Sequence, residues 1–344
     1  MTSDTQPPPQ IIEQYDLDPD SIQRLTGGLI NRSFSARRRD NSECVLQRVN
    51  SIFPATVNDN IDAVTRHLDE KGLATPLLIR SQNGSHHVSC DGEIWRLLTR
   101  IEGETFEDLP GDAAASEAGR ILGSFHQALS NFNRPLLNSR PPVHNLERHL
   151  GNLRQTLDAR EQHQARAEVA DIGQQIVGMS EELSTPPVSA DRLVHGDPKI
   201  SNVIFSAGRA ICLIDLDTVT RIPVAVELGD ALRSWCNPAG EDSADAHFSL
   251  PRFRLALEGY RLGAPGFLAE DEWRAIPDAA LSIALELAAR FAADALNESY
   301  FAWDPERFET ASEHNRTRAR AQLGLAKHIQ QQLPAMHDIV VTLI

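Results

Sequence analysis

The sequence predicts an α+β fold of two lobes, a small β-rich lobe over residues 1–102 and a larger helical lobe over residues 103–344. Short apolar or β-branched runs, separated by Gly, Asn and Asp turn signals, fill the first hundred residues. Apolar residues at helical spacing dominate from Glu104 onward. A chain of 344 residues is long enough for two lobes with a sizeable core.

The N-terminal lobe is expected to be an antiparallel sheet of hairpins crossed by one helix. Its predicted strands are residues 30–37, 44–49, 86–89 and 94–100. Between the second and third of these, residues 56–71 place apolar side chains at helical spacing and end at Gly72. Residues 1–10 are polar with three consecutive prolines, so we expect a frayed N-terminus outside the core.

Helical patterns fill the C-terminal lobe. One apolar stripe consists of Ala118, Ile121, Leu122, Phe125 and Leu129. Residues 255–262 and 279–296 predict further helices, and the second is apolar almost all round, which indicates burial in the centre of the lobe. Residues 131–146 predict a loop that leads into a charged, exposed helical stretch over residues 147–182.

Composition excludes several classes of protein. The net charge of −15, from 48 acidic and 33 basic residues, disfavours nucleic acid and anionic lipid as partners. No apolar run approaches the roughly 18 residues of a membrane span, and a cytoplasmic protein is expected. The four cysteines are widely spaced and contain no Cys-x2-Cys pair, so buried, reduced thiols are the default.

Residues 193–202 have the spacing of a phosphoryl-transfer loop. Asp197 lies five residues before Asn202. In a kinase-type catalytic loop, an Asp in this position accepts the substrate hydroxyl proton and the Asn holds a magnesium ion. Asp215 follows the apolar run 211–214, where a kinase needs its second metal ligand. The pattern predicts a nucleotide-dependent phosphotransferase.

Each half of this pattern also has a purely structural interpretation. An His-x-Asp at a strand end often forms a turn in which the Asp accepts backbone N–H bonds, and an Asp after a strand often caps the next element. The combination is more specific. The apolar pair 193–194 precedes the loop and the apolar runs 203–205 and 211–214 follow it, as in the strand-loop-hairpin context of a kinase site.

A turn with paired glycines is the candidate for covering the nucleotide phosphates. Gly27 and Gly28 would let backbone N–H groups approach phosphate oxygens, with Asn31 beside them, although Gly-Gly is also common in ordinary hairpins. The following strand lacks the lysine of protein kinases. Gln47 or Arg48 occupies that region, so either a neutral side chain faces the phosphates or Arg48 supplies the charge.

Residues 95–103 join the two predicted lobes. With Arg100 and Glu102 they form the candidate hinge along which adenine would bond to backbone, and a plain connection between lobes fits equally well. Glu286 and Arg290 lie four residues apart on the predicted buried helix. They predict either an intrahelical ion pair or an arginine that reaches a substrate group.

Four segments resemble the aminoglycoside phosphotransferase and choline kinase superfamily. They are residues 28–31 (GLIN), 45–54 (VLQRVNSIFP), 195–202 (HGDPKISN) and 213–218 (LIDLDT). Within the superfamily the chain is most similar to the N-acetylhexosamine 1-kinases. The similarity extends from about Leu25 to the C-terminal helix, including residues 229–233 and 286–291.

The resemblance implies a protein-kinase-like fold, with ATP and Mg²⁺ as cofactors, and transfer of the γ-phosphate to the anomeric hydroxyl of an amino sugar. Asp197 would be the catalytic base and Lys199 would lie close to the transferred phosphate. Asn202 and Asp215 would be the magnesium ligands, and Asp217 would assist at the metal or the sugar. Residues 1–102 would then be the nucleotide-binding lobe and residues 103–344 the catalytic and acceptor-binding lobe.

The expected acceptor contacts are Asp197, Asp217, Arg233 and Arg290. Residues 226–230 read Val-Glu-Leu-Gly-Asp where relatives carry Asp-Phe-Gly-Asp, close to the expected acceptor. The resemblance implies that the partner is a small-molecule acceptor, an amino sugar, and the chain is expected to be a monomer or a homodimer.

Two alternatives to a sugar kinase stay open. The first is a kinase for another alcohol, such as choline, ethanolamine, homoserine or an aminoglycoside. Only 6% of the residues are aromatic, which disfavours the aromatic cage that a choline-type cation needs. The second is a pseudokinase, suggested by the missing strand lysine and opposed by the intact Asp197, Asn202 and Asp215.

Overall fold

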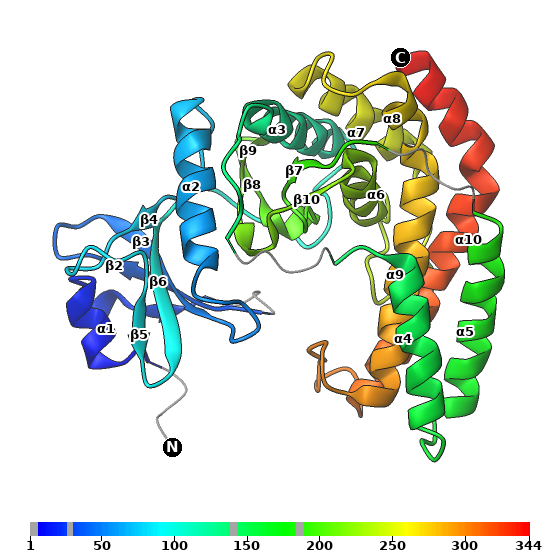
Figure 1. Cartoon of the computed structure of the whole chain (residues 1–344), viewed down its shortest axis with the longest axis horizontal. Helices are drawn as coiled ribbons and strands as arrows, with labels where there is room; N and C mark the ends of the chain where they lie inside the picture. Colours follow the sequence, from blue (N-terminus) through cyan, green and yellow to red (C-terminus); the bar gives the residue numbers. More distant parts are fainter. Residues whose placement is uncertain (1–5, 26–29, 138–142, 184–188) are drawn as a thin grey trace. The chain divides into compact units, whose positions relative to one another are not determined.

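The computed structural model describes residues 6–25, 30–137, 143–183 and 189–344. The chain divides into two compact units, coloured by sequence in Figure 1. The sheet unit comprises Met1–Gly103, Ala128–Arg140 and Cys212–Thr218. The helical unit comprises Glu104–Gln127, Pro141–Ile211 and Val219–Ile344. Two segments distant in sequence therefore pack with the first hundred residues.

The sheet unit contains an antiparallel sheet in the order β1-β2-β3-β6-β4, with β5 paired to the free part of β6. Its strands are β1 (Gln23–Arg24), β2 (Arg32–Arg37), β3 (Glu43–Val49), β4 (Leu78–Ile79), β5 (Val88–Cys90) and β6 (Glu93–Thr99). The four predicted strands correspond to β2, β3, β5 and β6. The sequence analysis missed β1 and β4, because two residues are too few to show a period of two.

Two helices accompany this sheet. Helix α2 (Val57–Glu70) is the predicted one, and it contacts β4 and the short helix η3 (Leu216–Thr218). Helix α1 (Pro9–Gln14) and the short η1 (Pro19–Ser21) were not predicted. The expectation that residues 1–10 are frayed is wrong for Pro9 and Gln10, which belong to α1. The apolar residues just after them explain this, because Ile11, Tyr15 and Leu17 join the core on one face of the sheet.

The helical unit is built mainly from eight helices in the described residues. They are α3 (Ala113–Leu129), α4 (Leu146–Ala159), α5 (Arg166–Glu181), α6 (Val224–Trp235), α7 (Leu250–Gly263), α8 (Glu270–Arg274), α9 (Ile276–Asn297) and α10 (Ala311–Leu343). Two small strand pairs accompany them. β7 (Arg192–Val194) pairs with β10 (Thr220–Ile222), and β8 (Val203–Ser206) pairs with β9 (Arg209–Leu213), whose first three residues belong to this unit.

Helix α9 lies at the centre of the helical unit, as its all-round apolar pattern predicted. It contacts α4, α5, α6 and α10, and α6 and α10 lie next to it in Figure 1. Its alanines permit close approach. A Cβ at Gly229 of α6 would lie only 2.7 Å from the backbone of Ala279, so α6 can pack against α9 at this distance only with glycine there.

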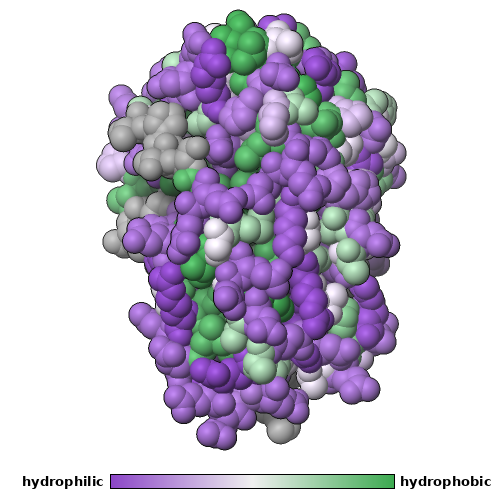
Figure 2. Space-filling view, turned by 90° about the vertical axis from the view of Figure 1, so that its right-hand side faces the viewer, coloured by the Kyte–Doolittle hydropathy of each residue, from purple (hydrophilic) through white to green (hydrophobic). Residues whose placement is uncertain are grey.

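The stretch predicted to be exposed over residues 147–182 forms two amphipathic helices, α4 and α5, rather than one exposed stretch. Their inner faces bury Leu150, Leu153, Val169 and Ile176. The outer surface of this side of the molecule is largely hydrophilic, with only small apolar areas between polar side chains (Figure 2). In the described residues, no helix combines the length and apolar character needed to cross a bilayer.

Candidate functional site

The loop with the phosphoryl-transfer spacing begins where β7 ends. β7 pairs with β10 so that Val194 lies opposite Thr220. The chain then turns through Gly196, whose φ of 84° lies in the left-handed region that favours glycine. His195 is fully buried, and its Nδ1 accepts a hydrogen bond from the Asp197 N–H at 3.3 Å. The imidazole therefore helps to fix the backbone of the loop.

The structure brings Asp197, Lys199 and Asn202 together in this loop. The Asn202 side-chain amide donates to the Asp197 backbone carbonyl at 2.8 Å and to Asp197 Oδ2 at 3.2 Å. The Lys199 Nζ lies 3.1 Å from the same Oδ2. Because the Asn202 nitrogen is directed at Asp197, its Oδ1 is left as the atom able to bind a cation.

Glu227 of α6 holds the backbone of this loop through hydrogen bonds. Its carboxylate is fully buried and accepts hydrogen bonds from the His195 N–H at 2.8 Å and the Gly196 N–H at 2.9 Å. The His126 Nε2 lies 3.4 Å from Glu227 Oε1, and the Tyr260 hydroxyl lies 2.8 Å from His126 Nδ1. Two consecutive backbone amides before Asp197 are thus fixed by one side chain.

The electrostatics of Glu227 follow from these contacts. Burial by itself would raise the pKa of the carboxyl, but His126, His195 and the Gly196 N–H together hold that pKa below its ordinary value. Glu227 is therefore ionised at neutral pH. Burial raises the pKa of the neighbouring Tyr260 hydroxyl well above its ordinary value, so Tyr260 stays protonated.

Helix α6 holds the loop at two further points. Its Trp235 donates from Nε1 to the Pro198 carbonyl at 2.9 Å. The Ser234 hydroxyl accepts from the Ile200 N–H at 3.5 Å. Since α6 itself packs closely on α9, the position of Asp197 depends on the most buried part of the helical unit.

A second cluster of site residues lies in the sheet unit, where Gln47 and Arg96 lie opposite each other on β3 and β6. The buried Arg96 guanidinium donates from Nε to Gln47 Oε1 at 2.8 Å. Its two terminal nitrogens donate to both carboxylate oxygens of Asp217, at 2.5 and 2.9 Å. The Asn31 side-chain amide donates to Asp217 Oδ2 at 2.5 Å. Asp217 is thus the centre of a fully paired buried network.

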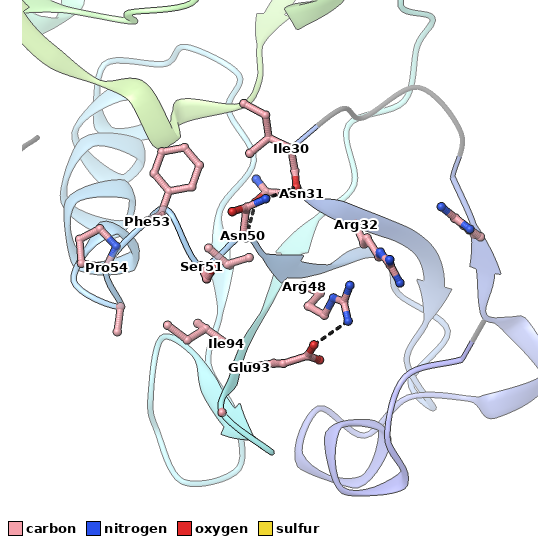
Figure 3. A pocket seen from close by; sticks show the side chains of 14 residues that line it. Ile30, Asn31, Arg32, Arg48, Asn50, Ser51, Phe53, Pro54, Glu93 and Ile94 are labelled. Atoms are coloured by element: carbon pink, nitrogen blue, oxygen red, sulfur yellow. Dashed lines mark hydrogen bonds and ion pairs between the residues drawn. The ribbon is translucent and has the colours of Figure 1, made fainter. Parts of the chain in front are cut away.

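This network decides which cation faces Gln47. Burial disfavours the charged form of Arg96, but Asp217, and with it Asp215, hold the pKa of the guanidinium above its ordinary value. Arg48 points to the opposite face of the sheet, as residues alternate along a strand, and pairs there with Glu93 at 2.6 Å (Figure 3). Of the two possibilities at the missing lysine, the neutral Gln47 shares the face with Asp217, and the charge on that face comes from Arg96.

Asp215 lies two residues before Asp217 in the same unit. Its φ of 66° is in the left-handed region, which Asp tolerates better than most residues. Two residues further on, Asp217 is held by Arg96 and Asn31, so the segment that carries Asp215 is anchored there. Asp215 belongs to the sheet unit and Asn202 to the helical unit, and each carries a side-chain oxygen of the kind that Mg²⁺ prefers. Among the described residues, no three His, Cys, Asp or Glu side chains form a metal-binding group by themselves.

The remaining predicted nucleotide contacts are two glycines, Arg100 and Glu102. Gly27 and Gly28 lie outside the described residues. Arg100 follows β6. Its guanidinium pairs with Glu43 at 3.4 Å, and 43% of its side chain is exposed. Glu102 is exposed near the end of the first segment of the sheet unit.

The predicted acceptor arginines differ in their surroundings. Arg233 of α6 is buried between Asp230, at 3.2 Å, and Glu241, at 2.6 Å. Arg290 of α9 lies over the Tyr300 and Phe301 rings, 5.8 and 5.4 Å from their centroids. A guanidinium at cation–π distance from aromatic rings keeps N–H groups that a sugar or phosphate oxygen can accept.

Glu286 does not form the predicted intrahelical ion pair in the described structure. Its carboxylate lies 3.1 Å from His144 Nδ1 and 3.8 Å from His149 Nε2. Asp230 approaches His144 Nε2 at 3.8 Å. Burial lowers the pKa of His144, but Glu286 and Asp230 outweigh that effect and raise it overall. Asp230 therefore links the environment of Arg233 to this buried histidine.

The sequence analysis missed two residues that the site depends on, Glu227 and Arg96. Glu227 was visible only as part of a segment that departs from its relatives. Arg96 lay in the candidate hinge, and only the register of β3 with β6 shows that it faces Gln47. A buried charge on a predicted strand was the one available signal, because such a charge needs a partner.

A family model described as "Phosphotransferase enzyme family" matches residues 21–273 of this chain. That range includes both clusters of site residues.

Solved structures similar to this chain cover nearly its whole length at low identity. An amicoumacin kinase, solved with AMP-PNP and Ca²⁺, is 15% identical over 90% of this chain and 91% of its own, with a TM-score of 0.63. A microcompartment-associated aminopropanol kinase is 16% identical over 95% and 97%, with a TM-score of 0.63. An aminoglycoside phosphotransferase from Alicyclobacillus acidocaldarius is 16% identical over 97% and 99%, with a TM-score of 0.60. These similarities confirm the predicted kinase-like α+β fold.

Proposed function

The chain belongs to the phosphotransferase enzyme family, and on that premise we propose that it transfers the γ-phosphate of ATP to the anomeric hydroxyl of an N-acetylhexosamine or a related sugar. The observation that carries the proposal is the loop around Asp197. The Asp197 carboxylate is fixed by Asn202 and Lys199. The backbone N–H groups of His195 and Gly196, just before it, are fixed by Glu227. Such preorganisation is what a general base requires.

The proposed step assigns one role to each group in this loop. Asp197 accepts the proton of the acceptor hydroxyl, and the acceptor oxygen forms the new bond to the γ-phosphorus. The bond from that phosphorus to the bridging oxygen breaks, and ADP leaves with the electron pair. Lys199 lies within ion-pair distance of Asp197 and supplies positive charge beside the transferred group.

Asn202 and Asp215 fit a divalent metal by their donor chemistry. A divalent cation held by these two side chains would supply positive charge that stabilises the charge developing on the phosphates during transfer. The similar amicoumacin kinase was solved with AMP-PNP and Ca²⁺, which supports a nucleotide and a divalent cation as ligands here. In the sheet unit, Asn31, Gln47 and Arg96 are the candidate contacts for the nucleotide. With Arg96 as a cation on that face, the absence of a strand lysine does not favour a pseudokinase.

The acceptor assignment rests on the resemblance of residues 45–54 and 213–218 to the N-acetylhexosamine 1-kinases. Arg290 supports it, since a guanidinium beside aromatic rings suits hydroxyl or carbonyl oxygens better than an ammonium group. An amino alcohol or aminoglycoside is the second candidate. Similar structures include an aminopropanol kinase and a spectinomycin phosphotransferase. The buried Asp230 and Glu286 also supply negative charge in the helical unit.

The test is ADP release from magnesium-ATP with a panel of acceptors, followed by phosphorus NMR of the product. The panel contains N-acetylglucosamine, N-acetylgalactosamine, glucosamine, galactose, choline, ethanolamine, homoserine, aminopropanol and kanamycin. We expect turnover with an N-acetylhexosamine and a product signal coupled to the anomeric proton. Turnover only with an amine-bearing alcohol would retain the chemistry and replace the acceptor.

Replacing Asp197 with Asn is the matched control. The change keeps the shape of the side chain and removes the proton acceptor, so turnover should fall by roughly 10²–10⁴-fold while nucleotide affinity changes little. Equal turnover by this variant and the wild type would refute the assignment of Asp197. Nucleotide binding with no turnover on any acceptor, in the wild type, would favour the pseudokinase.

A further inference from the structure

A cavity of about 600 Å³ lies in the sheet unit at one end of its sheet (Figure 3). The ends of β1, β2 and β3 and the turn between β5 and β6 line it. Of the proposed nucleotide contacts in the described residues, Asn31 alone reaches it. Its volume falls within the range of small-molecule sites, which is about 300–1,000 Å³.

Three arginines line this cavity on one face of the sheet. Arg32 of β2 lies directly opposite Arg48 of β3, and Arg24 of β1 lies opposite Phe34, two residues along β2. Because side chains alternate along a strand, all three point to the face opposite the one that carries Gln47. The arginines are therefore separated by the sheet from the network around Asp217.

Positive charge exceeds negative charge in the lining. Three arginines face one carboxylate, Glu93, which is bonded to Arg48 at 2.6 Å. Like charges directly opposite each other on neighbouring strands destabilise a sheet. Among the described residues, the exposed side chain of Arg24 forms no hydrogen bond or ion pair. This local surplus occurs in a chain whose net charge is −15, so it is not a consequence of overall composition.

The wall beside the arginines is already ordered. The Asn50 N–H donates to Asn31 Oδ1 at 2.9 Å, and the Asn50 side-chain amide donates to the Ile30 carbonyl at 3.1 Å. Figure 3 shows Asn31 and Asn50 bonded to each other on the side of the cavity away from Glu93. A ligand entering this cavity would not need to order that wall, which reduces the entropic cost of binding.

We propose that this cavity binds a small phosphate-bearing anion at a site separate from that of the donor nucleotide. Arginine guanidinium groups bind phosphate oxygens through paired, charge-assisted hydrogen bonds, and Arg24, Arg32 and Arg48 line the cavity from three strands. Asn31 lines the cavity and donates to Asp217, so a ligand that moves Asn31 acts on the segment that carries Asp215.

The test is calorimetric titration of the full chain with inorganic pyrophosphate at one fixed ionic strength. The cavity variant is Arg24→Gln with Arg32→Gln, which leaves the Arg48–Glu93 pair in place. The control is Arg37→Gln with Arg39→Gln, which removes the same charge from exposed arginines that pair elsewhere with Asp18 and Asp16. The single change Arg24→Gln, at an exposed side chain, repeats the test with minimal risk to folding.

We expect one pyrophosphate per chain, an affinity at least about tenfold weaker in the cavity variant, and less than about a twofold change in the control. No binding by the wild type, or equal losses in both double variants, would overturn the proposal. A second pyrophosphate titration, in the presence of a saturating non-hydrolysable ATP analogue, decides whether the arginines bind a separate anion or the phosphates of the donor nucleotide. Abolished pyrophosphate binding would assign the arginines to the donor nucleotide and refute a separate site. Binding is measured without turnover, so these outcomes do not depend on the proposed function.

Discussion

Replacing Glu227 with Gln should uncouple the loop around Asp197 from helix α6. The carboxylate is fully buried and accepts two backbone N–H groups, from His195 and Gly196. A glutamine keeps the shape and one acceptor oxygen, but its NH₂ group must face one of these N–H donors. Two donors cannot satisfy each other, so one backbone amide loses its partner.

The magnitude follows from the lost contacts. A hydrogen bond to a charged group contributes about 1.5–3 kcal/mol, and a buried unsatisfied donor costs about 1–3 kcal/mol. Together they predict a loss of roughly 3–5 kcal/mol in the free energy of unfolding. For a unit of this size, 1 kcal/mol corresponds to about 2–4 °C, so Tm should fall by roughly 6–20 °C. Displacement of Asp197 should lower kcat by about 10–100-fold.

The pH dependence provides a sharper readout. Contacts with His126, His195 and the Gly196 N–H hold the pKa of Glu227 below its ordinary value of 4.5 in the folded chain. Its contribution to stability is therefore complete above pH 4.5 and is lost as the pH falls through the lowered pKa. The difference in Tm between wild type and variant should be constant near neutrality and should narrow below about pH 4.5.

The assays are thermal unfolding across pH and steady-state kinetics on the acceptor found in the panel. Glu168→Gln is the control, because Glu168 of α5 pairs with Arg316 and Arg320 of α10, away from the loop. This control should lose some stability and retain kcat. The reasoning about Glu227 is refuted if its variant keeps both the wild-type Tm and the wild-type kcat, or if the two variants lose kcat equally.

Three further predictions concern other parts of the chain. Asp217→Asn leaves the buried Arg96 without a full counter-charge and should lower the free energy of unfolding of the sheet unit by about 3–5 kcal/mol, measured by hydrogen exchange. Unchanged protection of β3 and β6 would contradict the network. Asp215→Ala should weaken magnesium-dependent nucleotide binding, and an unaltered magnesium titration would argue against Asp215 as a ligand. Burial raises the pKa of Cys44 to about 11 and that of Cys212 to about 12, so native chain at pH 8 should resist Ellman's reagent until it unfolds. Prompt labelling before unfolding would show that these thiols are accessible.

Much of the fold was predictable because its signals are local. The strands β2, β3, β5 and β6, the helix α2 and the buried helix α9 each show their period within a single segment. The exposed stretch over residues 147–182 was misjudged, since the apolar residues that α4 and α5 bury are diluted by charged ones. Helix α1 was missed because a six-residue helix gives too few repeats of a helical pattern.

The candidate site was predictable where its residues are close together in the chain. Asp197, Lys199 and Asn202 belong to one ten-residue stretch, and their spacing alone indicated the chemistry. The structure shows them in mutual contact. Their catalytic roles stay predictions until the variants are measured.

The sequence by itself determined the class of fold, the phosphoryl-transfer spacing of residues 193–202 and the absence of a lysine on β3. Only the tertiary structure decided that Arg96 lies beside Gln47 and that Arg48 points to the other face of the sheet. It also decided that Glu227 binds the backbone N–H groups of His195 and Gly196. The physical reason is that tertiary packing joins segments far apart in the chain, as in the pair of Asn31 and Asp217, which are 186 residues apart. Such pairings depend on the burial of the whole unit, and no local pattern of residues specifies them.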